Sequence, residues 1–505
     1  METKATSSSS APPPDPVTLA TTLLDHLSQS LASFPGTHKY TVQVLRSQPR
    51  RSYALFPHAS NPKTKIWQEE VLVVLSEERK LPSLQPRTDS NPSTSKPLDP
   101  PTRPNDATAS LPIVALEASL YTIPSTSTTL LYISKIDTSG LSSSPSPART
   151  LVASFLSFHL LHPPHDSTRL RVHIFARAQG QYLFPGSVEN KEKRVLDDKG
   201  LLRWWKGCIA LSAEGVQDAK LYYLIPGLSL SESLPYVPST PSPPWTYSHP
   251  YHHPSPLFPP PPSSSTDPPA STLLTDLIPT FPDDPKSRYL HSLTSSSLPP
   301  SGTSGDYDDR VASLSSTAFS TASALSHQLQ RGELERERGR ERSRVLASCR
   351  GVEEWWEGMA WRQECCSGTL VGFFGIVSDG IVVEGGVGRE RGKEKGEKGT
   401  GETGLRGVRG AVPHATFTKL WSEFHNVDYA WTGVEKLVWA AGKWERDLEM
   451  VVRSEGVDGG GEGVERECRR VVEVRNEVGK RVRELEEVKK VNVMVPRKKK
   501  KVEVN

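Results

Sequence analysis

Blocks of Ser, Pro and Gly divide this 505-residue chain, and they limit how much of it can fold. The hydrophobic content is 35%, and the 44 prolines cluster in blocks instead of spreading along the chain. Such blocks bury too little apolar surface to offset the conformational entropy of the chain. The remaining residues suffice for one large domain with surface insertions. We therefore predict disorder in five blocks, Met1–Pro16, Pro82–Thr108, Leu234–Pro269, Thr294–Asp306 and Glu384–Gly410.

The segments between these blocks carry both helical and strand patterns. Apolar periodicity predicts helices at Val17–Ser33, Leu151–Leu161, Gly200–Leu211, Ser271–Ile278, Pro285–Leu293, Val352–Glu364 and, as one or two helices, Phe417–Leu448. Short runs rich in Val, Leu and Tyr predict strands at Tyr40–Leu45, Tyr53–Pro57, Glu70–Leu75, Ile113–Tyr121, Thr129–Ile136, Leu170–Phe175 and Thr369–Val377. This irregular order favours an α+β fold with a central mixed β-sheet flanked by helices.

The C-terminal part of the chain carries two further features. Apolar residues from Val464 to Leu485 recur at intervals of three, four and seven, which predicts an amphipathic helix at residues 464–490. Residues 491–505 form a tail that holds the basic run Arg497–Lys501. A run of this kind is typical of a nuclear import signal, of a contact with an acidic partner, or of a solvated end. The large domain is assigned to residues 17–453.

Charge and targeting patterns restrict the class of protein. A net charge of +3 is close to balance, which argues against a nucleic-acid polycation. The first residues hold no apolar core like that of a signal peptide, and no run approaches the roughly 18 apolar residues that span a bilayer. We therefore expect a soluble intracellular protein. No spacing of Cys and His suits zinc, so neither a metal nor a disulfide is expected.

One dense stretch, Phe175–Trp205, combines an aromatic–proline turn, a basic stretch and a tryptophan pair. Together with FPDDPKSRYLHSL at Phe281–Leu293, it resembles the fungal histone acetyltransferases that work with histone chaperones, the regulator of Ty transposition family. Those enzymes are divergent relatives of the CBP-type coactivator acetyltransferases. The resemblance also covers VEEWWEGMAWRQECCSG, FTKLWSEFHNVDY and the terminal PRKKKK. It implies an enzyme that uses acetyl-CoA, with core histones and histone chaperones as partners.

The hexapeptide FPDDPK allows two interpretations of Asp284. A lysine in water titrates at about 10.4, so acetyl transfer needs a group that takes its proton, and a carboxylate in partly apolar surroundings is a suitable base. Asp before Pro is also a common helix start, with Asp284 as the cap and Pro285 at the first position. The residues alone favour the cap. The resemblance implies a catalytic aspartate at Asp284 and a self-acetylated lysine at Lys286. The roles of helix cap and catalytic group are compatible at Asp284.

The tryptophan pair is the next candidate. Neighbouring residues on a helix point about 100° apart, so one indole of Trp204 and Trp205 can pack inward while the other forms a wall. By residue type alone, such a pair belongs in a core. The resemblance implies that Trp205 is functionally sensitive and that Trp204 lies against the cofactor. It also places Tyr182, otherwise a buried tyrosine at a turn, near the channel that admits the lysine.

The segment SKIDTSG, Ser134–Gly140, is predicted as a strand end followed by a turn. Its backbone N–H groups could bind the pantetheine amides of coenzyme A, although an ordinary Asp-Thr-Ser-Gly turn explains the residues alone. The resemblance implies acetyl-CoA contacts at Ile136, Asp137 and Thr138, and an activity that depends on Asp137.

The phosphates of coenzyme A require cations or a helix N-terminus. Arg149, at the start of the helix predicted at Leu151–Leu161, is the best local candidate. The resemblance implies further cofactor contacts at Phe175, Arg194, Val195 and Leu196.

Together, these features predict a nuclear histone lysine N-acetyltransferase that acts on histone three, with a chaperone, in chromatin assembly and the DNA-damage response. With no nucleophilic Cys–His pair suggested, the lysine attacks the thioester directly. The alternative is a non-enzymatic nuclear scaffold that binds chromatin partners through its Pro-rich tracts and basic tail. Neither interpretation involves a membrane or sequence-specific DNA binding, and acetyl-CoA binding distinguishes the two.

Overall fold

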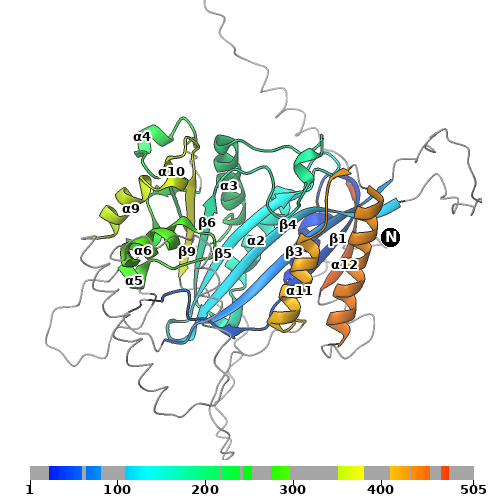
Figure 1. Ribbon diagram of the computed structural model, residues 1–505, viewed down its shortest axis with the longest axis horizontal. Helices are drawn as coiled ribbons and strands as arrows, with labels where there is room; N and C mark the ends of the chain where they lie inside the picture. The colour runs from blue at the N-terminus through cyan, green and yellow to red at the C-terminus, as the bar shows by residue number, and fades with distance from the viewer. Residues whose placement is uncertain are drawn as a thin grey trace, which may run out of the picture.

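A mixed β-sheet runs through the structure, a computed structural model shown in Figure 1. The structure describes residues 22–57, 59, 64–80, 108–216, 218–238, 243–252, 257, 274–295, 351–379, 410–431, 434–454 and 468–476. In this part of the chain, ten strands join in the order β10-β1-β3-β4-β5-β6-β9-β7-β8, with β2 paired to β3. They are β1 (Gly36–Arg46), β2 (Arg50–Arg51), β3 (Trp67–Lys80), β4 (Thr108–Ile123), β5 (Thr128–Thr138), β6 (Arg169–Ala176), β7 (Lys220–Leu224), β8 (Trp245–Tyr247), β9 (Gly372–Asp379) and β10 (Arg469–Asn476).

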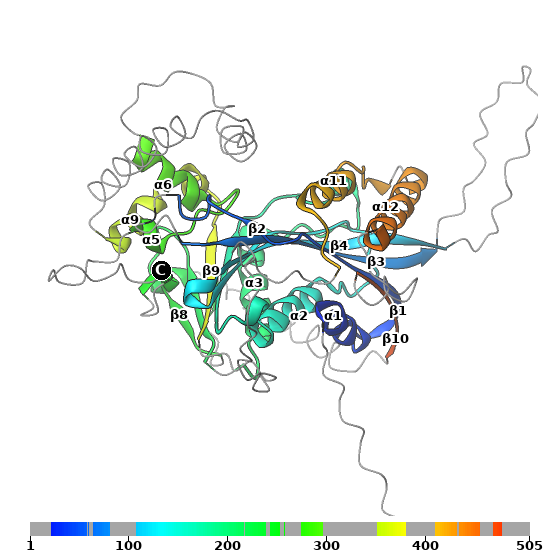
Figure 2. The ribbon, with the colours of Figure 1, turned by 90° about the horizontal axis from the view of Figure 1, so that it is seen from below.

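Helices cover both faces of this sheet (Figure 2). One face carries α1 (Leu23–Ala32), α2 (Ala148–Leu161) and α3 (Asp198–Ser212), and the opposite face carries α11 (His414–His425) and α12 (Val434–Ser454). The end of the sheet near β9 carries α5 (Leu274–Leu277), α6 (Pro285–Ser295), α9 (Val352–Ala360) and α10 (Gln363–Cys366), and α4 (Leu230–Ser233) follows β7. The prediction of an α+β fold with a flanked mixed sheet is confirmed.

The local sequence explains why these elements form. In α1, Leu24, Leu27 and Leu31 are almost fully buried at helical spacing, and the Thr22 side chain caps the helix by accepting from the Asp25 N–H at 3.1 Å. The middle of β3, Val71–Leu75, is completely buried because helices cover both faces of the sheet there.

The strand order explains where a site can lie. The strands β1, β3, β4 and β5 form a meander, because they pair antiparallel in succession. The chain then returns through α2, so that β6 lies parallel to β5, and this pairing ends at Ile133 and Ile174. Beyond it, β5 runs on to Thr138. Open sheets with helices on both faces bind ligands outside the carboxyl ends of such parallel strands.

The predicted C-terminal helix at residues 464–490 is wrong where the structure describes it. Residues Arg469–Asn476 form β10, which pairs antiparallel with β1 at the edge of the sheet. The segment RRVVEVRN also alternates with period two, and Val472 and Val474 point into the core while Val471 is 43% exposed. The unpaired edge of β1 offers backbone hydrogen bonds that a separate helix would leave unmade. The sheet therefore extends beyond the expected domain end at residue 453.

A truncation series tests the contribution of β10. We expect a chain that ends at Ser454 to be less stable than one that ends at Asn476, because only the shorter chain loses the burial of Cys468, Val472 and Val474. The shorter chain also loses the ion pair between Arg470 and Asp25. Melting temperatures of the two purified proteins measure the difference, and equal values would show that β10 adds nothing.

Three other expectations are corrected. The Pro-rich block Leu234–Pro269 is folded in part, since β8 within it pairs with β7 and completes that edge of the sheet. Tyr53–Pro57 forms bends instead of a strand, because Leu55 and Phe56 turn into a small core beneath Phe281 and the Leu55 carbonyl accepts from the Thr280 N–H. The helix expected at Val352–Glu364 breaks at Trp361, which is 84% exposed.

Several predictions concern residues that the structure does not describe. They are the blocks at 1–16, nearly all of 82–108, most of 384–410, the part of 294–306 beyond Ser295, and the basic tail at 491–505. Among the described residues, none of the helices combines the length and apolarity needed to cross a membrane.

Candidate active site

The candidate site lies at the carboxyl ends of the parallel strands β5 and β6. Ile136, Asp137 and Thr138 occupy the part of β5 that extends past the pairing with β6, and Phe175 occupies the corresponding end of β6. The two strands thus bring four of the predicted cofactor contacts to one edge. This is the position at which an open sheet binds a ligand.

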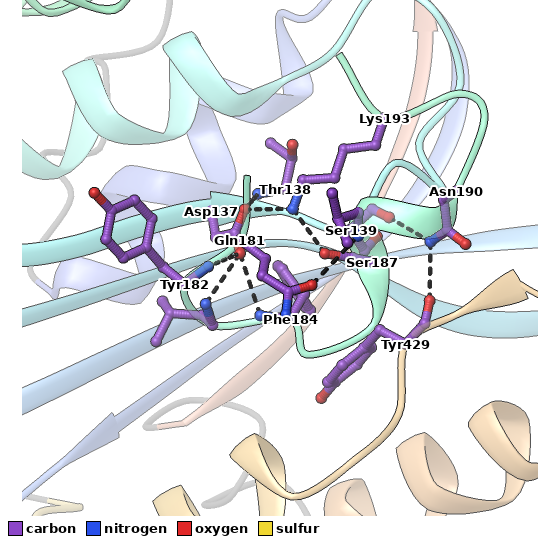
Figure 3. A network of polar contacts seen from close by, with 12 residues as sticks. Asp137, Thr138, Ser139, Gln181, Tyr182, Phe184, Ser187, Asn190, Lys193 and Tyr429 are labelled. Atoms are coloured by element: carbon purple, nitrogen blue, oxygen red, sulfur yellow. Dashed lines mark hydrogen bonds and ion pairs between the residues drawn. The ribbon is translucent and has the colours of Figure 1, made fainter. Parts of the chain in front are cut away.

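Asp137 organises this edge (Figure 3). One carboxylate oxygen accepts from the N–H groups of Tyr182, Leu183 and Phe184 at 2.6, 3.0 and 3.2 Å. The other accepts from the N–H of Thr138 at 2.8 Å and lies 2.9 Å from the ammonium of Lys193. A carboxylate that receives this many donors acts as an anchor, and here it fixes the turn QYLFPG against the end of β5.

Tyr182 points away from the Asp137 carboxylate that holds its backbone (Figure 3). Its hydroxyl donates to the Arg177 carbonyl, and burial raises the pKa of the phenol to about 12. The side chain therefore stays neutral and protonated at physiological pH.

The two indoles of the tryptophan pair point in different directions, as expected for neighbouring residues on a helix. Trp205 is 3% exposed and belongs to the main core, while Trp204 is half-buried against that core. Their rings meet edge to face, with centroids 5.1 Å apart. The structure therefore makes Trp205 the inward member, and the more accessible indole is that of Trp204.

The residues near the start of α2 suit the phosphates of coenzyme A. Arg149 lies in the first turn of α2, and its side chain is exposed. Its guanidinium lies against Gly207 of α3, where an added Cβ would be 2.0 Å from one of the guanidinium nitrogens. The N-cap residue of α2, Pro147, has no side-chain hydrogen bond to the helix. Arg149 and Arg194 are cations of the kind that bind phosphates, whereas at the N-terminus of α2 the Ser146 hydroxyl already accepts from the Ala148 N–H at 3.4 Å. Arg194 and Val195 are exposed and Leu196 is half-buried.

FPDDPK places a buried ion pair beside this edge. Asp284 caps α6, since one carboxylate oxygen accepts from the Lys286 N–H at 2.9 Å, and the other pairs with the Lys286 ammonium. Asp284 is 0% and Lys286 is 3% exposed. Both interpretations of Asp284, as a helix cap and as a catalytic group, are compatible with this geometry, because the cap is formed and the same carboxylate holds a lysine ammonium. The preceding residue, Asp283, has a φ of 58°, a left-handed conformation that stores strain outside glycine.

Aromatic side chains connect FPDDPK to the sheet. Phe281 stacks on Tyr132 of β5 with ring centroids 4.3 Å apart. The Lys286 ammonium lies 4.6 Å from the ring centroid of Phe373 on β9, and that ring is 5.0 Å from Phe175. The ring of Phe373 thus connects the buried ion pair to Phe175, a predicted cofactor residue.

An exposed ion pair makes a second connection. Lys135 lies 3.7 Å from the carboxylate of Asp283 and is two residues from Asp137. SKIDTSG and FPDDPK are therefore neighbours, although they are far apart in the sequence.

Burial sets the ionisation of the groups near this site. It lowers the pKa of His173, with Lys286 and Arg171 adding to the effect, so the imidazole is neutral. It raises the pKa of Cys208 and of Cys365 to about 12, so neither supplies a thiolate at neutral pH. The described residues contain no group of three His, Cys, Asp or Glu side chains that could hold a metal ion.

Lys193 and Asn190 belong to the site but were not anticipated. The sequence ENKEKR reads only as a basic stretch, and no local signal marks which of its lysines turns inward. Asn190 likewise carries no motif, although its amide joins Ser139 to Tyr429 in the structure. Their partners lie up to about 240 residues away, so only the tertiary fold identifies them.

Comparison with known proteins defines the class. Residues 147–397, about half of the chain, match the model of the histone acetyltransferase KAT11-type domain. This stretch includes α2, the tryptophan pair, FPDDPK and β9. The chain belongs to the KAT11-type histone acetyltransferases, and family membership implies acetyl-CoA as the co-substrate.

Within that family, its relatives are fungal proteins of the Rtt109 type. It is 30% identical to histone acetyltransferase rtt109 of Aspergillus flavus over 49% of this chain and 42% of that protein. It is 28% identical to histone acetyltransferase rtt109 of Schizosaccharomyces pombe over 48% of this chain and 51% of that protein. The aligned region therefore spans about half the length of these relatives. The crystal structure of Rtt109 from Aspergillus fumigatus shares the fold with a TM-score of 0.55 at 22% identity, covering 90% of this chain and all of that one.

Proposed function

We propose that this protein transfers an acetyl group from acetyl-CoA to a histone lysine. One observation carries the proposal: the KAT11-type match covers the tryptophan pair and FPDDPK, and FPDDPK contacts β5 through Phe281 on Tyr132 and Asp283 on Lys135. The proposed site has two halves. One half is the edge organised by Asp137 with Arg149 and Arg194, and the other is the buried carboxylate of Asp284 in aromatic surroundings.

Each group of residues has a defined task in this proposal. Acetyl-CoA supplies the thioester, and the chain supplies binding, orientation and proton removal. Ile136, Asp137 and Thr138 with Phe175 line the cofactor edge, and Arg149 with Arg194–Leu196 bind the phosphate-bearing end. Trp204 lies against the cofactor, while Tyr182 and Trp205 shape the channel for the lysine stem.

Asp284 either holds the substrate lysine or takes its proton. In the structure its carboxylate is bound by the ammonium of Lys286, which supports the proposal that this carboxylate can hold a lysine amine. Self-acetylation of Lys286 would remove this charge and free one carboxylate oxygen. The high thiol pKa of Cys208 and Cys365 favours direct attack by the lysine over a cysteine-bound acetyl group.

The finer part of the proposal concerns substrate and partners. We infer histone three as the acceptor, a histone chaperone as the partner and the nucleus as the location, with roles in chromatin assembly and the DNA-damage response. The relatives' names give histone acetyltransferase activity, and the basic run Arg497–Lys501 suits nuclear import and an acidic chaperone.

Two measurements test the proposal. Calorimetry with acetyl-CoA on the purified full chain should show saturable binding, which a scaffold has no reason to display. Acetyl transfer to histone three should then be measured with and without a histone chaperone, using mass spectrometry to locate the modified lysine and any acetyl group on Lys286. Absence of both binding and transfer would leave the scaffold as the better description.

The basic tail supplies a separate prediction. Truncation after Val495 removes Arg497–Lys501 and none of the apolar residues of the described core, so the melting temperature should not change. Nuclear accumulation and chaperone-dependent acetylation should both fall, because basic runs bind import receptors and acidic partners. Microscopy of a fluorescent fusion and the acetylation assay measure the two effects. Normal import and normal acetylation would make the run a solvated end.

A further inference from the structure

Lys193 is a buried lysine at the edge of the candidate site. Its side chain is 3% exposed, whereas the next two residues, Arg194 and Val195, are exposed. Burying an ammonium is unfavourable unless it is paired and hydrogen-bonded. The position of Lys193, directly before the predicted cofactor segment Arg194–Leu196, links this burial to the site.

The partners of Lys193 come from two other segments. Its ammonium lies 2.9 Å from a carboxylate oxygen of Asp137 and donates to the Ser187 hydroxyl at 2.7 Å. Figure 3 shows the side chain reaching from its loop to the end of β5. The same carboxylate binds the backbone of Tyr182, so one ion pair joins β5, the turn QYLFPG and the cofactor segment.

The backbone also approaches closely at this point. Gly140 has a φ of 77°, and a Cβ there would lie 2.6–2.8 Å from backbone and Cβ atoms of Lys193. The SKIDTSG turn and Lys193 are therefore in direct contact, and only glycine fits the turn.

Asn190 holds the other end of the loop. Its amide donates to the Ser139 carbonyl at 2.7 Å and to the Tyr429 carbonyl at 2.9 Å, and accepts from the Trp431 N–H at 2.6 Å. The loop is thus fixed before Lys193 by neutral hydrogen bonds, and at Lys193 by an ion pair.

We propose that Lys193 is a positioning residue whose ammonium holds Arg194–Leu196 against the end of β5, in the conformation that binds acetyl-CoA. The identity of this ligand rests on the proposed function. A loop that is ordered before binding loses less entropy when the ligand arrives, so the ion pair acts on affinity and not on the chemical step. Lys193 does not touch the reacting atoms in this scheme.

The test compares Lys193→Met with Lys193→Arg and with the control Lys191→Met, which changes an exposed lysine of the same loop. Lys193→Met should raise the KM and the Kd for acetyl-CoA about 10–100-fold, the equivalent of one lost charge-assisted hydrogen bond, with kcat within a few-fold. Lys193→Arg should restore most of the affinity, and Lys191→Met should match the parent. Hydrogen exchange of residues 191–197, measured without ligand, should accelerate in Lys193→Met alone.

The exchange measurement keeps this inference separate from the proposed function. If the parent does not bind acetyl-CoA, the proposed function fails, and faster exchange in Lys193→Met would still support the positioning role. Unchanged exchange, or a loss of kcat with unchanged KM, would overturn it. Should Lys193→Met fail to fold, Lys193→Gln removes the charge but keeps an amide that can donate to Asp137, and its exchange at 191–197 must then exceed that of the control Lys191→Met.

Discussion

Replacing Asp284 by Asn is expected to lower both the stability of the fold and the rate of acetyl transfer. Asn caps a helix about as well as Asp, so the hydrogen bond to the Lys286 N–H can persist. The lost charge is the larger effect, because it leaves the 3%-exposed Lys286 ammonium without its carboxylate. Breaking a buried ion pair on one side costs about 3–5 kcal/mol. Urea unfolding of the variant and the parent measures this cost.

The fall in stability must be separated from any loss of chemistry. The double variant Asp284→Asn, Lys286→Gln removes both charges, and it should regain most of the stability lost in Asp284→Asn. The single variant Lys286→Gln keeps the carboxylate and serves as its matched reference. If Asp284 is the base, the double variant should turn over about 10²–10⁴-fold more slowly than Lys286→Gln while binding acetyl-CoA equally well. Turnover within a few-fold of that reference would assign Asp284 to capping and charge pairing alone.

The sheet could be predicted largely from the sequence, because its central strands are long apolar runs. Val71–Leu75 lies in a buried central strand, and its composition reveals this without any partner. The edge strands could not be predicted in this way. β8 has only three residues and lies in a Pro-rich block, and β10 carries apolar residues that fit a helical period equally well. Their structure is decided by pairing with β7 and β1, and a local pattern does not contain that information.

The candidate site shows the same division between local and distant contacts. The cap at Asp284 and its pairing with Lys286 involve residues two positions apart, so the sequence FPDDPK indicates both. Asp137 instead binds the backbone of Tyr182, 45 residues later, and residue type does not reveal that contact. The burial of Trp205 also depends on which face of α3 meets the sheet. The sequence could say that one indole packs inward, but not which one.

Replacing Trp205 by Ala is expected to lower the stability of the fold about as much as Asp284→Asn does. The indole is 3% exposed within the main core, and truncation of such a side chain costs about 3–5 kcal/mol. Trp204→Ala should cost clearly less, because Trp204 is only half-buried, and should mainly weaken acetyl-CoA binding. Urea unfolding and calorimetry with coenzyme A measure the two effects.

The proposed channel role of Trp205 requires a variant that keeps the core filled. Trp205→Phe retains an aromatic ring and most of the buried area, so its stability should stay well above that of Trp205→Ala. If the indole also walls the lysine channel, Trp205→Phe should lose turnover while its affinity for coenzyme A stays near that of the parent. A stable Trp205→Phe with normal turnover would show that the indole is needed only for packing. Any activity lost in Trp205→Ala would then be a consequence of unfolding, because phenylalanine would have replaced the indole without changing turnover.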